Sequence, residues 1–288
     1  MRVFVTGATG FIGSAVVREL LGAGHQVLGL ARSDQGEASL RAAGADVLRG
    51  GLAELDVLRE GAKDTDGVIH TAFIHDFTDY LAAARTDRLA IEAMGDVLAG
   101  SDRPFVVSAA LGLADVATEE DAIVPGAAAR VSEEVALGFA DRGVRVSVMR
   151  LPASVHGEGD HGFVPRLIEI AREKGVSAYP GDGSNHWPAV HRFDAARLFR
   201  LALERAPAGT RLHPLGDKGI PLREIAGVIG RHLGLPVVSA EPEHFGWLGR
   251  FVALDVRATS AITEKLMDWR PEQPGLIEDL EAGHYFTS

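Results

Sequence analysis

The 288-residue sequence contains no cysteine, which excludes disulfide bonds, thiolate metal sites and a cysteine nucleophile. Long hydrophobic runs are missing too, since no apolar stretch approaches the roughly 18 residues that a membrane helix needs. The chain opens directly into a strand-like segment, without the charged and apolar regions of a secretion signal. We therefore expect a cytoplasmic protein, although the missing cysteines leave the redox compartment itself open.

Basic residues are scarce: 29 lysines and arginines stand against 40 aspartates and glutamates, a formal net charge of −11. Because neutralising phosphate requires a basic face, this balance disfavours a nucleic-acid partner. The acidic excess is most simply a solvated surface. Hydrophobic residues make up 46% of the chain, enough for the core of one large α/β unit or of a domain with a smaller companion.

The first fourteen residues organise the rest of the chain. A short apolar run leads into Gly7, Gly10 and Gly13, and an apolar-periodic segment follows, which predicts a strand, a tight turn and a helix. Gly7 allows a sharp turn, Gly10 lets backbone N–H groups approach a pyrophosphate, and Gly13 lets the helix pack close to the strand. The helix N-terminus then presents its partial positive charge to the phosphates. We favour nucleotide binding over a purely structural turn, because the motif lies where that mechanism requires it.

Strand-like and helix-like segments alternate through the first half of the chain, the pattern of a parallel sheet covered by helices on both faces. Several predicted helices end at a glycine, as helix C-termini prefer. Six strands with helices between them predict an α/β fold with a doubly wound parallel sheet, in which the ligand lies across the carboxyl ends of the strands. The predicted strands are residues 2–6, 26–31, 46–49, 67–71, 105–109 and 145–151, and the predicted helices are residues 11–23, 37–43, 54–62, 79–98 and 130–142.

The regular alternation ends at Pro152. Loops rich in glycine, histidine and proline then alternate with predicted helices at residues 164–174, 194–205, 222–233 and 259–267. We expect residues 1–151 to form a dinucleotide-binding domain. Residues 152–288 are expected to form mainly a smaller α/β substrate domain, with some segments returning to the first domain. The second domain would lie over the strand ends and close the site.

With these segments in place, the sequence resembles the extended and atypical short-chain dehydrogenases/reductases, the group that includes NAD-dependent epimerase/dehydratase-like proteins. The resemblance covers nearly the whole chain, and its motifs follow in the family's order and spacing. They are TGATGFIG at residues 6–13, DGVIHTA at 66–72, VVS at 106–108, MRLP at 149–152, VHG at 155–157, VHRFDAA at 190–196 and LMDWRP at 266–271. The resemblance implies a Rossmann domain, a nicotinamide cofactor and a C-terminal substrate domain.

The resemblance also implies which residues contact the cofactor. They lie in the glycine-rich turn and at or after the ends of the second, fourth, fifth and sixth predicted strands. These residues are Gly7, Thr9, Gly10, Phe11, Ile12, Gly13, Arg32, Thr71, Ala72, Ser108 and Pro152.

The sequence departs from this family at the catalytic pair Tyr-x-x-x-Lys, in which the tyrosine supplies a proton while the lysine lowers its pKa and holds the ribose. No tyrosine here is followed four residues later by a lysine; the three are Tyr80, Tyr179 and Tyr285. Spacing back from Arg150 puts the places of the pair near residues 125–126 and 129–130, which makes Arg130 a candidate catalytic residue. Alanines also follow Ser108, where the family usually has a second serine or threonine.

Arg32 directly follows the second predicted strand. No carboxylate occupies Gly29, Leu30 or Ala31, where an NAD enzyme offers one to the ribose hydroxyls. A guanidinium there can fork onto the 2′-phosphate of NADP, so we expect NADP(H) as the cofactor. The alternatives are a solvated loop arginine and an NAD-type acceptor at Asp34.

His75 and Asp76 follow the fourth predicted strand, at the carboxyl edge where cofactor and substrate meet. Titratable groups among aromatic rings can have shifted pKa values that suit proton transfer, so both are candidate catalytic residues. The neighbouring Phe73 is expected in the substrate pocket. In the alternative, Asp76 caps the next helix and His75 hydrogen-bonds a loop.

His156 and His161 lie in a glycine-rich loop that faces the substrate in the resembling family. We take His156 as a second candidate proton donor and His161 as a pocket residue, against the alternative that both are surface groups. Their spacing fits no zinc template, so we expect no metal. Trp187 is expected to wall the pocket with its apolar ring. The family's counterparts of His191 and Asp194 join the domains and cap a helix, and we expect the same here.

Together these residues predict an NADP(H)-dependent oxidoreductase that transfers hydride to a small carbonyl or imine compound. Two other functions stay open: an epimerase or dehydratase with a recycled cofactor, and a catalytically silent NADP-binding regulator. The proton source is open as well, because either a histidine replaces the missing tyrosine or a cationic imine accepts hydride without an acid. We expect a small-molecule partner, no nucleic acid or membrane, and a homodimer as the default assembly.

Overall fold

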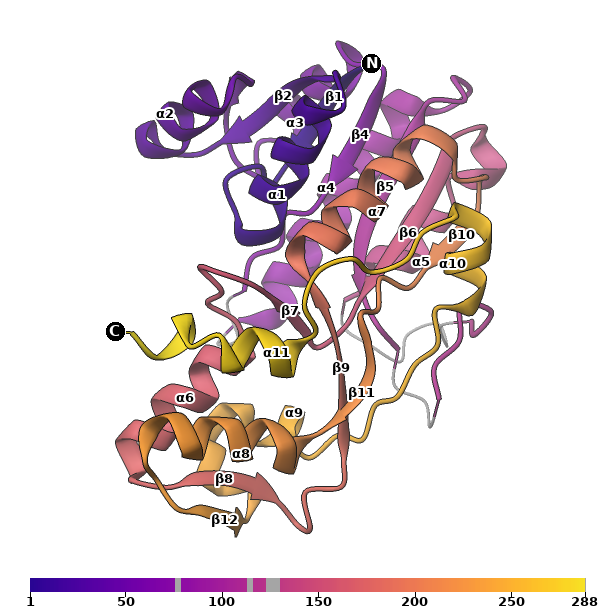
Figure 1. Ribbon diagram of the computed structural model, residues 1–288. Coiled ribbons are helices and arrows are strands. Elements are labelled where there is room, and N and C mark those ends of the chain that lie inside the picture. Colours follow the sequence, from indigo (N-terminus) through magenta and orange to yellow (C-terminus); the bar gives the residue numbers. More distant parts are fainter. Residues whose placement is uncertain (76–78, 113–115, 123–129, 288) are drawn as a thin grey trace.

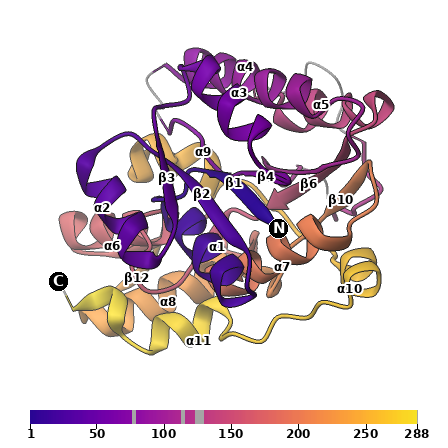
Figure 2. The same cartoon turned by 90° about the horizontal axis from the view of Figure 1, so that it is seen from above.

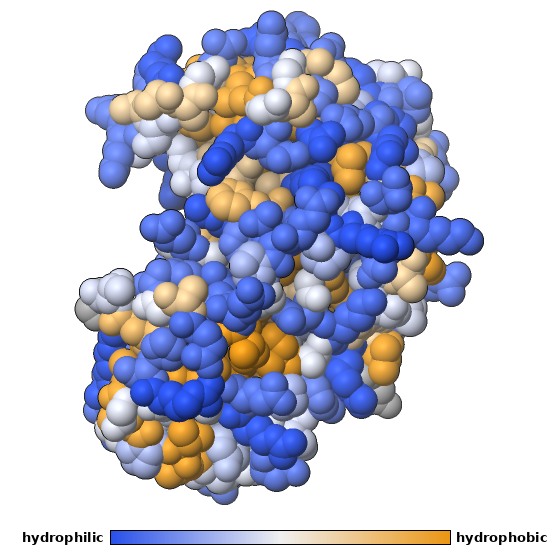
Figure 3. Space-filling view, viewed as in Figure 1, coloured by the Kyte–Doolittle hydropathy of each residue, from blue (hydrophilic) through white to orange (hydrophobic). Residues whose placement is uncertain are grey.

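The computed structural model describes residues 1–75, 79–112, 116–122 and 130–287 of the chain. An upper body of parallel strands and helices holds the N-terminus, and a lower body of helices and short strands lies beneath it (Figure 1). The surface in the same view is largely hydrophilic and is hollowed between the two bodies (Figure 3). Among the described residues, no helix is both long and apolar enough to cross a membrane.

Seven parallel strands form the sheet of the upper body, in the order β10-β6-β5-β4-β1-β2-β3. They are β1 (Arg2–Thr6), β2 (Gln26–Ala31), β3 (Asp46–Arg49), β4 (Gly67–His70), β5 (Pro104–Ala110), β6 (Arg145–Leu151) and β10 (Thr210–Leu212). The strand order reverses between β1 and β4, because the chain runs outward to β3 on one side and to β6 on the other. The predicted doubly wound sheet is confirmed, and its switch point lies at the end of β1.

Helices cover both faces of this sheet, and a hydrophobic cluster lies between helices and strands on each face. α1 and α7 pack together on one face, while α3, α4 and α5 lie on the other (Figure 2). The helices of this body are α1 (Phe11–Gly22), α2 (Asp34–Ala43), α3 (Leu55–Lys63), α4 (Tyr80–Leu98), α5 (Ser132–Leu137), η1 (Ala140–Arg142) and α7 (Arg192–Arg205). Because both faces are covered, β1 and β4 are nearly uninterrupted buried runs.

A third hydrophobic cluster, drawn from residues 163–286, forms the core of the lower body. Strands β11, β9 and β7 form one small sheet, and β12 and β8 form another. The remaining elements of the chain are β7 (Ser154–His156), α6 (Phe163–Lys174), β8 (Ser177–Pro180), β9 (His186–His191), β11 (Asp217–Pro221), α8 (Leu222–Leu233), β12 (Val237–Ala240), η2 (Pro242–Leu248), α9 (Gly249–Val252), α10 (Ala261–Met267), α11 (Leu276–Glu281) and η3 (His284–Phe286).

The predicted elements of the first half are present with small shifts. All six predicted strands form, and four have the predicted bounds. The predicted helix over residues 130–142 is wrong in part, because α5 ends at Leu137 and the separate 3-10 turn η1 follows. The strand β10 was not predicted, and it extends the main sheet by pairing with β6.

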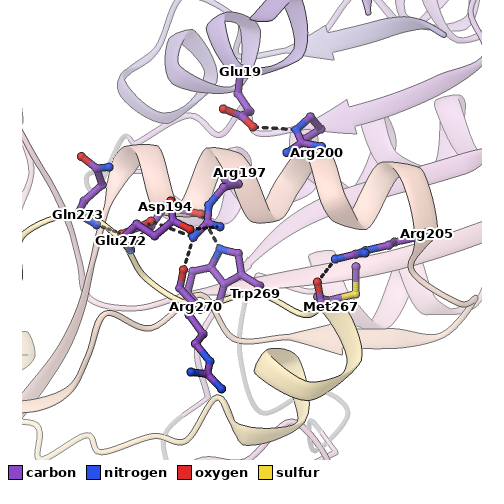
Figure 4. Close-up of polar contacts among 10 residues, drawn as sticks. All are labelled: Glu19, Asp194, Arg197, Arg200, Arg205, Met267, Trp269, Arg270, Glu272 and Gln273. Atoms are coloured by element: carbon purple, nitrogen blue, oxygen red, sulfur yellow. Dashed lines mark hydrogen bonds and ion pairs between the residues drawn. The ribbon is translucent and has the colours of Figure 1, made fainter. Parts of the chain in front are cut away.

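Helix α7 ties distant segments of the chain together (Figure 4). His191 caps its N-terminus, accepting from the Phe193 N–H at 3.2 Å. The buried Asp194 carboxylate accepts hydrogen bonds from the backbone N–H groups of Glu272 and Gln273, each at 2.9 Å.

Three arginines of α7 bind other segments of the chain. Their bonds run from Arg197 to the Arg270 carbonyl, from Arg200 to the Glu19 carboxylate and from Arg205 to the Met267 carbonyl. The helix therefore joins α1 to the segment at residues 267–273.

We predict that Asp194→Ala lowers the free energy of unfolding by about 2–4 kcal/mol, because two backbone N–H groups lose a charged acceptor in a buried setting. Urea denaturation followed by circular dichroism measures the loss. Asp96→Ala is the matched control, since that carboxylate is 57% exposed in an ion pair with Arg142 and its removal should change stability by less than about 1 kcal/mol. Equal losses in the two variants would show that Asp194 is no anchor.

Candidate active site at the carboxyl edge of the sheet

The glycine turn between β1 and α1 has no room for a side chain at Gly7 or Gly13 and has more room at Gly10. Gly7 has a left-handed backbone with φ of +68°. A Cβ added to Gly13 would lie 2.0 Å from the Gly7 carbonyl oxygen, so α1 packs against the turn with no room for a side chain. A Cβ at Gly10 would meet only that carbonyl oxygen, at 3.2 Å. That single contact is tight, so a backbone without a Cβ at Gly10 gives a pyrophosphate the closest approach to this turn.

Helix α1 begins at this opening. Gly10 is its N-cap, no side chain of the described residues bonds its first N–H groups, and no acidic residue lies in its first turn. Thr9 and Gly10 are exposed, and Phe11 and Ile12 are partly buried. The first N–H groups of a helix have no partner within the helix, and with the helix dipole they form a site for an anion. The predicted cofactor residues of the turn thus surround a positive helix end to which no side chain of the described residues is hydrogen-bonded.

Arg32 follows β2 at the same edge and is exposed. Its stem lies beside Gly51, and its guanidinium makes no hydrogen bond or ion pair with the residues that the structure describes. Asp34, the alternative ribose acceptor, lies 2.9 Å from the Arg49 guanidinium in an exposed ion pair. Ser33 caps α2 between them, accepting from the Gly36 N–H at 3.1 Å. The arginine is therefore available at the edge, while the carboxylate already faces a cation.

The other predicted cofactor residues lie along this edge. Thr71 and Ala72 directly follow β4, and Thr71 Oγ1 donates to the Thr6 carbonyl at 2.8 Å. Ser108 is buried near the end of β5, and Pro152 is buried directly after β6.

A buried chain of hydrogen bonds runs behind the edge from β1 to Arg130. Thr6 Oγ1 lies 2.7 Å from His70 Nδ1, and His70 Nε2 lies 3.2 Å from Asp87 Oδ1. The Ser132 hydroxyl donates to Asp87 Oδ2 at 2.5 Å and accepts from Arg130 Nε at 2.8 Å. Burial alone would raise the pKa of Asp87, but the hydrogen bond and charge of His70, with Arg130 and Ser132, lower it. Asp87 is therefore an ionised carboxylate in the core.

Arg130 ends this chain at the edge of the sheet. One terminal nitrogen donates to the Ser108 carbonyl at 3.0 Å, and the guanidinium carbon lies 4.0 Å from the centre of the Phe73 ring. Burial lowers the pKa of Arg130, although a guanidinium keeps its charge in proteins. The structure thus places one candidate catalytic residue beside a candidate pocket residue.

His75 lies close to Arg130 and is exposed. Its ring meets Phe73 edge-on at 5.2 Å between centres. The loss of water on the side of the ring that faces the protein, and the positive charges of Arg130 and His161, lower the pKa of His75 below its ordinary value of 6.5. The neighbouring candidate Asp76 lies outside the described residues.

His161 lies across the edge from this group, on the loop between β7 and α6. Its ring meets Phe11 at the start of α1, edge-on at 5.8 Å between centres. Tyr285 holds the loop: its hydroxyl donates to Asp160 Oδ2 at 3.1 Å and accepts from the Gly157 N–H at 3.1 Å. Burial raises the pKa values of Asp160 and of Tyr285. Residues from both bodies therefore meet at the glycine turn.

Two candidates are buried and require correction. His156 is completely buried in β7, with Nδ1 2.8 Å from the Asp279 carboxylate, so its ring has no open face toward a substrate. Trp187 is 1% exposed in the core of the lower body, where its Nε1 donates to the Phe251 carbonyl at 3.2 Å. The prediction of His156 as a proton donor and of Trp187 as a pocket wall is therefore wrong.

The comparisons with known proteins agree with the motifs. Residues 3–91 match the NAD dependent epimerase/dehydratase family. The chain is 48% identical to an uncharacterized protein of Schizosaccharomyces pombe, over 99% of this chain and 100% of that protein. It is 30% identical to the 2-alkyl-3-oxoalkanoate reductase of Stenotrophomonas maltophilia, over 83% of this chain and 77% of the reductase.

A solved structure shares the fold over almost its whole length. MoeE5 in complex with UDP-glucose and NAD matches with a TM-score of 0.79 and 24% identity, over 99% of this chain and 97% of that one. The matched relatives and the shared fold confirm the resemblance that the sequence motifs indicated. The chain belongs to the NAD-dependent epimerase/dehydratase family of the extended short-chain dehydrogenases/reductases.

Proposed function

We propose that the protein is an NADP(H)-dependent reductase that transfers hydride to the carbonyl carbon of a small molecule. One observation supports this proposal most. The cationic Arg130 and the titratable His75 both lie against the Phe73 ring, at the same edge of the sheet as the glycine turn. Two relatives are reductases by name, the 2-alkyl-3-oxoalkanoate reductase and a ketoreductase of Stigmatella aurantiaca that is 28% identical over 73% of this chain.

The residues of the edge fit a dinucleotide. The space at Gly10 and the N-terminus of α1 suit the pyrophosphate, and the available Arg32 suits a 2′-phosphate. When bound, the reduced nicotinamide supplies the hydride.

Reduction of a ketone leaves negative charge on its oxygen and then requires a proton there. We assign the first task to Arg130, whose second terminal nitrogen makes no hydrogen bond with the described residues and would donate to a developing alkoxide. We assign the second task to His75, which would donate its proton to the same oxygen and be left neutral. The two groups then replace the tyrosine and lysine that the sequence lacks.

Reduction of an imine is the second candidate, because a cationic imine needs no proton donor after hydride transfer. Arg130 favours the carbonyl, since a guanidinium that contacts the substrate would repel a cationic one. Consumption of NADPH with a panel of ketones and imines tests the proposal. An epimerase or dehydratase would convert a sugar without net oxidation, and a regulator would bind NADPH without turnover. A homodimer and a cytoplasmic location stay predictions.

The glycine turn generates the first prediction for this site. Gly10→Val should leave a folded protein that NADPH no longer stabilises, because the added side chain fills the space in front of α1. A thermal-shift titration measures this. Gly22→Ala is the control, since a Cβ there meets nothing within 4 Å and NADPH should stabilise that variant as it does the wild type. Full stabilisation of Gly10→Val by NADPH would exclude this turn as the phosphate site.

Arg32 generates a prediction on cofactor choice. Arg32→Ala should weaken NADPH binding by about 1.5–3 kcal/mol and leave NADH binding unchanged, because only NADPH has the 2′-phosphate. Fluorescence titration with both cofactors measures the difference. Arg41→Ala, which removes an exposed arginine of α2 that pairs with Glu37, should change neither affinity. Equal weakening of both cofactors, or a wild-type preference for NADH, would contradict the assignment.

The lowered pKa of His75 generates a pH prediction. The donor must be protonated to act. The kcat for reduction should therefore be constant at low pH and fall about tenfold per pH unit above the pKa of His75, which lies below 6.5. Arg130→Gln removes a positive neighbour and should therefore shift the fall to higher pH. His75→Gln should lower kcat by about 10²–10⁴-fold and remove the fall. A flat wild-type profile, with His75→Gln within a few-fold of wild type, would rule out His75 as the acid.

A further inference from the structure

Behind Arg130, the core of the upper body contains a carboxylate that packing does not require. Asp87 is 1% exposed, and its neighbours along α4 include the buried apolar Ala90, Ile91 and Met94. A buried charge is costly unless it is paired, and an apolar side chain of similar volume is often tolerated as well or better. The presence of a carboxylate at position 87 is therefore better explained by a functional need for its charge than by a contribution to stability.

The two oxygens of Asp87 face different partners. Oδ1 is 3.2 Å from His70 Nε2, and Oδ2 is 2.5 Å from the Ser132 hydroxyl and 3.8 Å from Arg130 Nε. His70 Nδ1 lies 2.7 Å from the hydroxyl oxygen of Thr6, the last residue before the glycine turn. A continuous chain of hydrogen bonds therefore joins β1 to α4 through the His70 ring.

The ionised Asp87 fixes the direction of the Ser132 hydroxyl. A carboxylate only accepts and a hydroxyl has a single proton, so Ser132 must donate to Asp87 and turn its lone pairs toward Arg130 Nε, 2.8 Å away. The Ser108 carbonyl holds a second nitrogen of Arg130 at 3.0 Å. Two acceptors on different elements thus fix the plane of the guanidinium over Phe73.

We propose that Asp87 and Ser132 are positioning residues of this enzyme: the charged Asp87 orients the Ser132 hydroxyl, which holds Arg130 where negative charge develops on the substrate. The inference rests on the proposed function of Arg130. In this proposal both side chains act on the substrate only through the guanidinium. Because this chain of hydrogen bonds reaches Thr6, the same buried groups hold both Arg130 and the strand end that leads into the glycine turn.

A double-mutant cycle tests the proposal in the full-length protein with its best ketone substrate. Ser132→Ala should lower kcat by about 10–100-fold, because a small displacement of a catalytic group costs that much, and should change the KM for NADPH less than about threefold. The same change in an Arg130→Gln background should alter kcat less than about twofold, since the group on which the hydroxyl acts has gone. Asp87→Asn keeps the shape, removes the charge, and should match Ser132→Ala in both backgrounds.

Ser147→Ala is the matched control. Ser147 is a buried serine of β6 whose hydroxyl has no hydrogen-bond partner in the described structure, and its removal should leave kcat unchanged. Circular dichroism and the thermal shift with NADPH show whether each variant folds. If Ser132→Ala does not fold, Asp87→Asn provides the test. Losses that are equal in the wild-type and Arg130→Gln backgrounds, or no loss at all, overturn the positioning role while leaving the reductase intact. A wild-type protein that binds NADPH but reduces no ketone or imine refutes the proposed function, and the inference with it.

Discussion

The close approach of α1 to the end of β1 determines where the rest of the molecule lies. Only glycine at positions 7 and 13 permits that approach, because a Cβ at Gly13 would overlap the Gly7 carbonyl. With α1 in this place, α7 packs beside it, and α7 in turn binds the backbone at residues 272 and 273 through Asp194. The glycine turn is therefore both the opening of the site and the start of the contacts that join the two bodies.

The sequence predicted the upper body well because its signals are local. Buried parallel strands appear as short apolar runs, and glycines end the helices between them, so β1 to β6 were found with small errors. The strands β7 to β12 have three to six residues each in glycine- and proline-rich sequence, which is too short for a periodic pattern. β10 is the clearest case, because only its pairing with β6 defines three residues as a strand.

The site was predictable to the same extent. The glycine turn follows from the spacing of its glycines, and the places of Arg32 and His75 follow from strand order, since residues after parallel strands meet at one edge. His156 looked like a loop histidine, because its partner Asp279 lies 123 residues later in the chain. Asp87 resembled any acidic residue on a solvated helix face, and only the distant partners His70 and Ser132 show that it is buried. The sequence gives no local signal for contacts of that kind.

The bonds from Tyr285 to Gly157 and Asp160 have a consequence for how the protein forms on the ribosome. Gly157 and Tyr285 are 128 residues apart, so the loop that presents His161 has no Tyr285 to hold it until that stretch has been translated. At roughly 5–20 residues per second the delay is on the order of ten seconds. The residues of β1 to β6 and of the glycine turn have all been translated by residue 151, before this interval begins. The two sides of the site are thus translated at different times, the phosphate side first and the tyrosine that holds the opposite loop well after it.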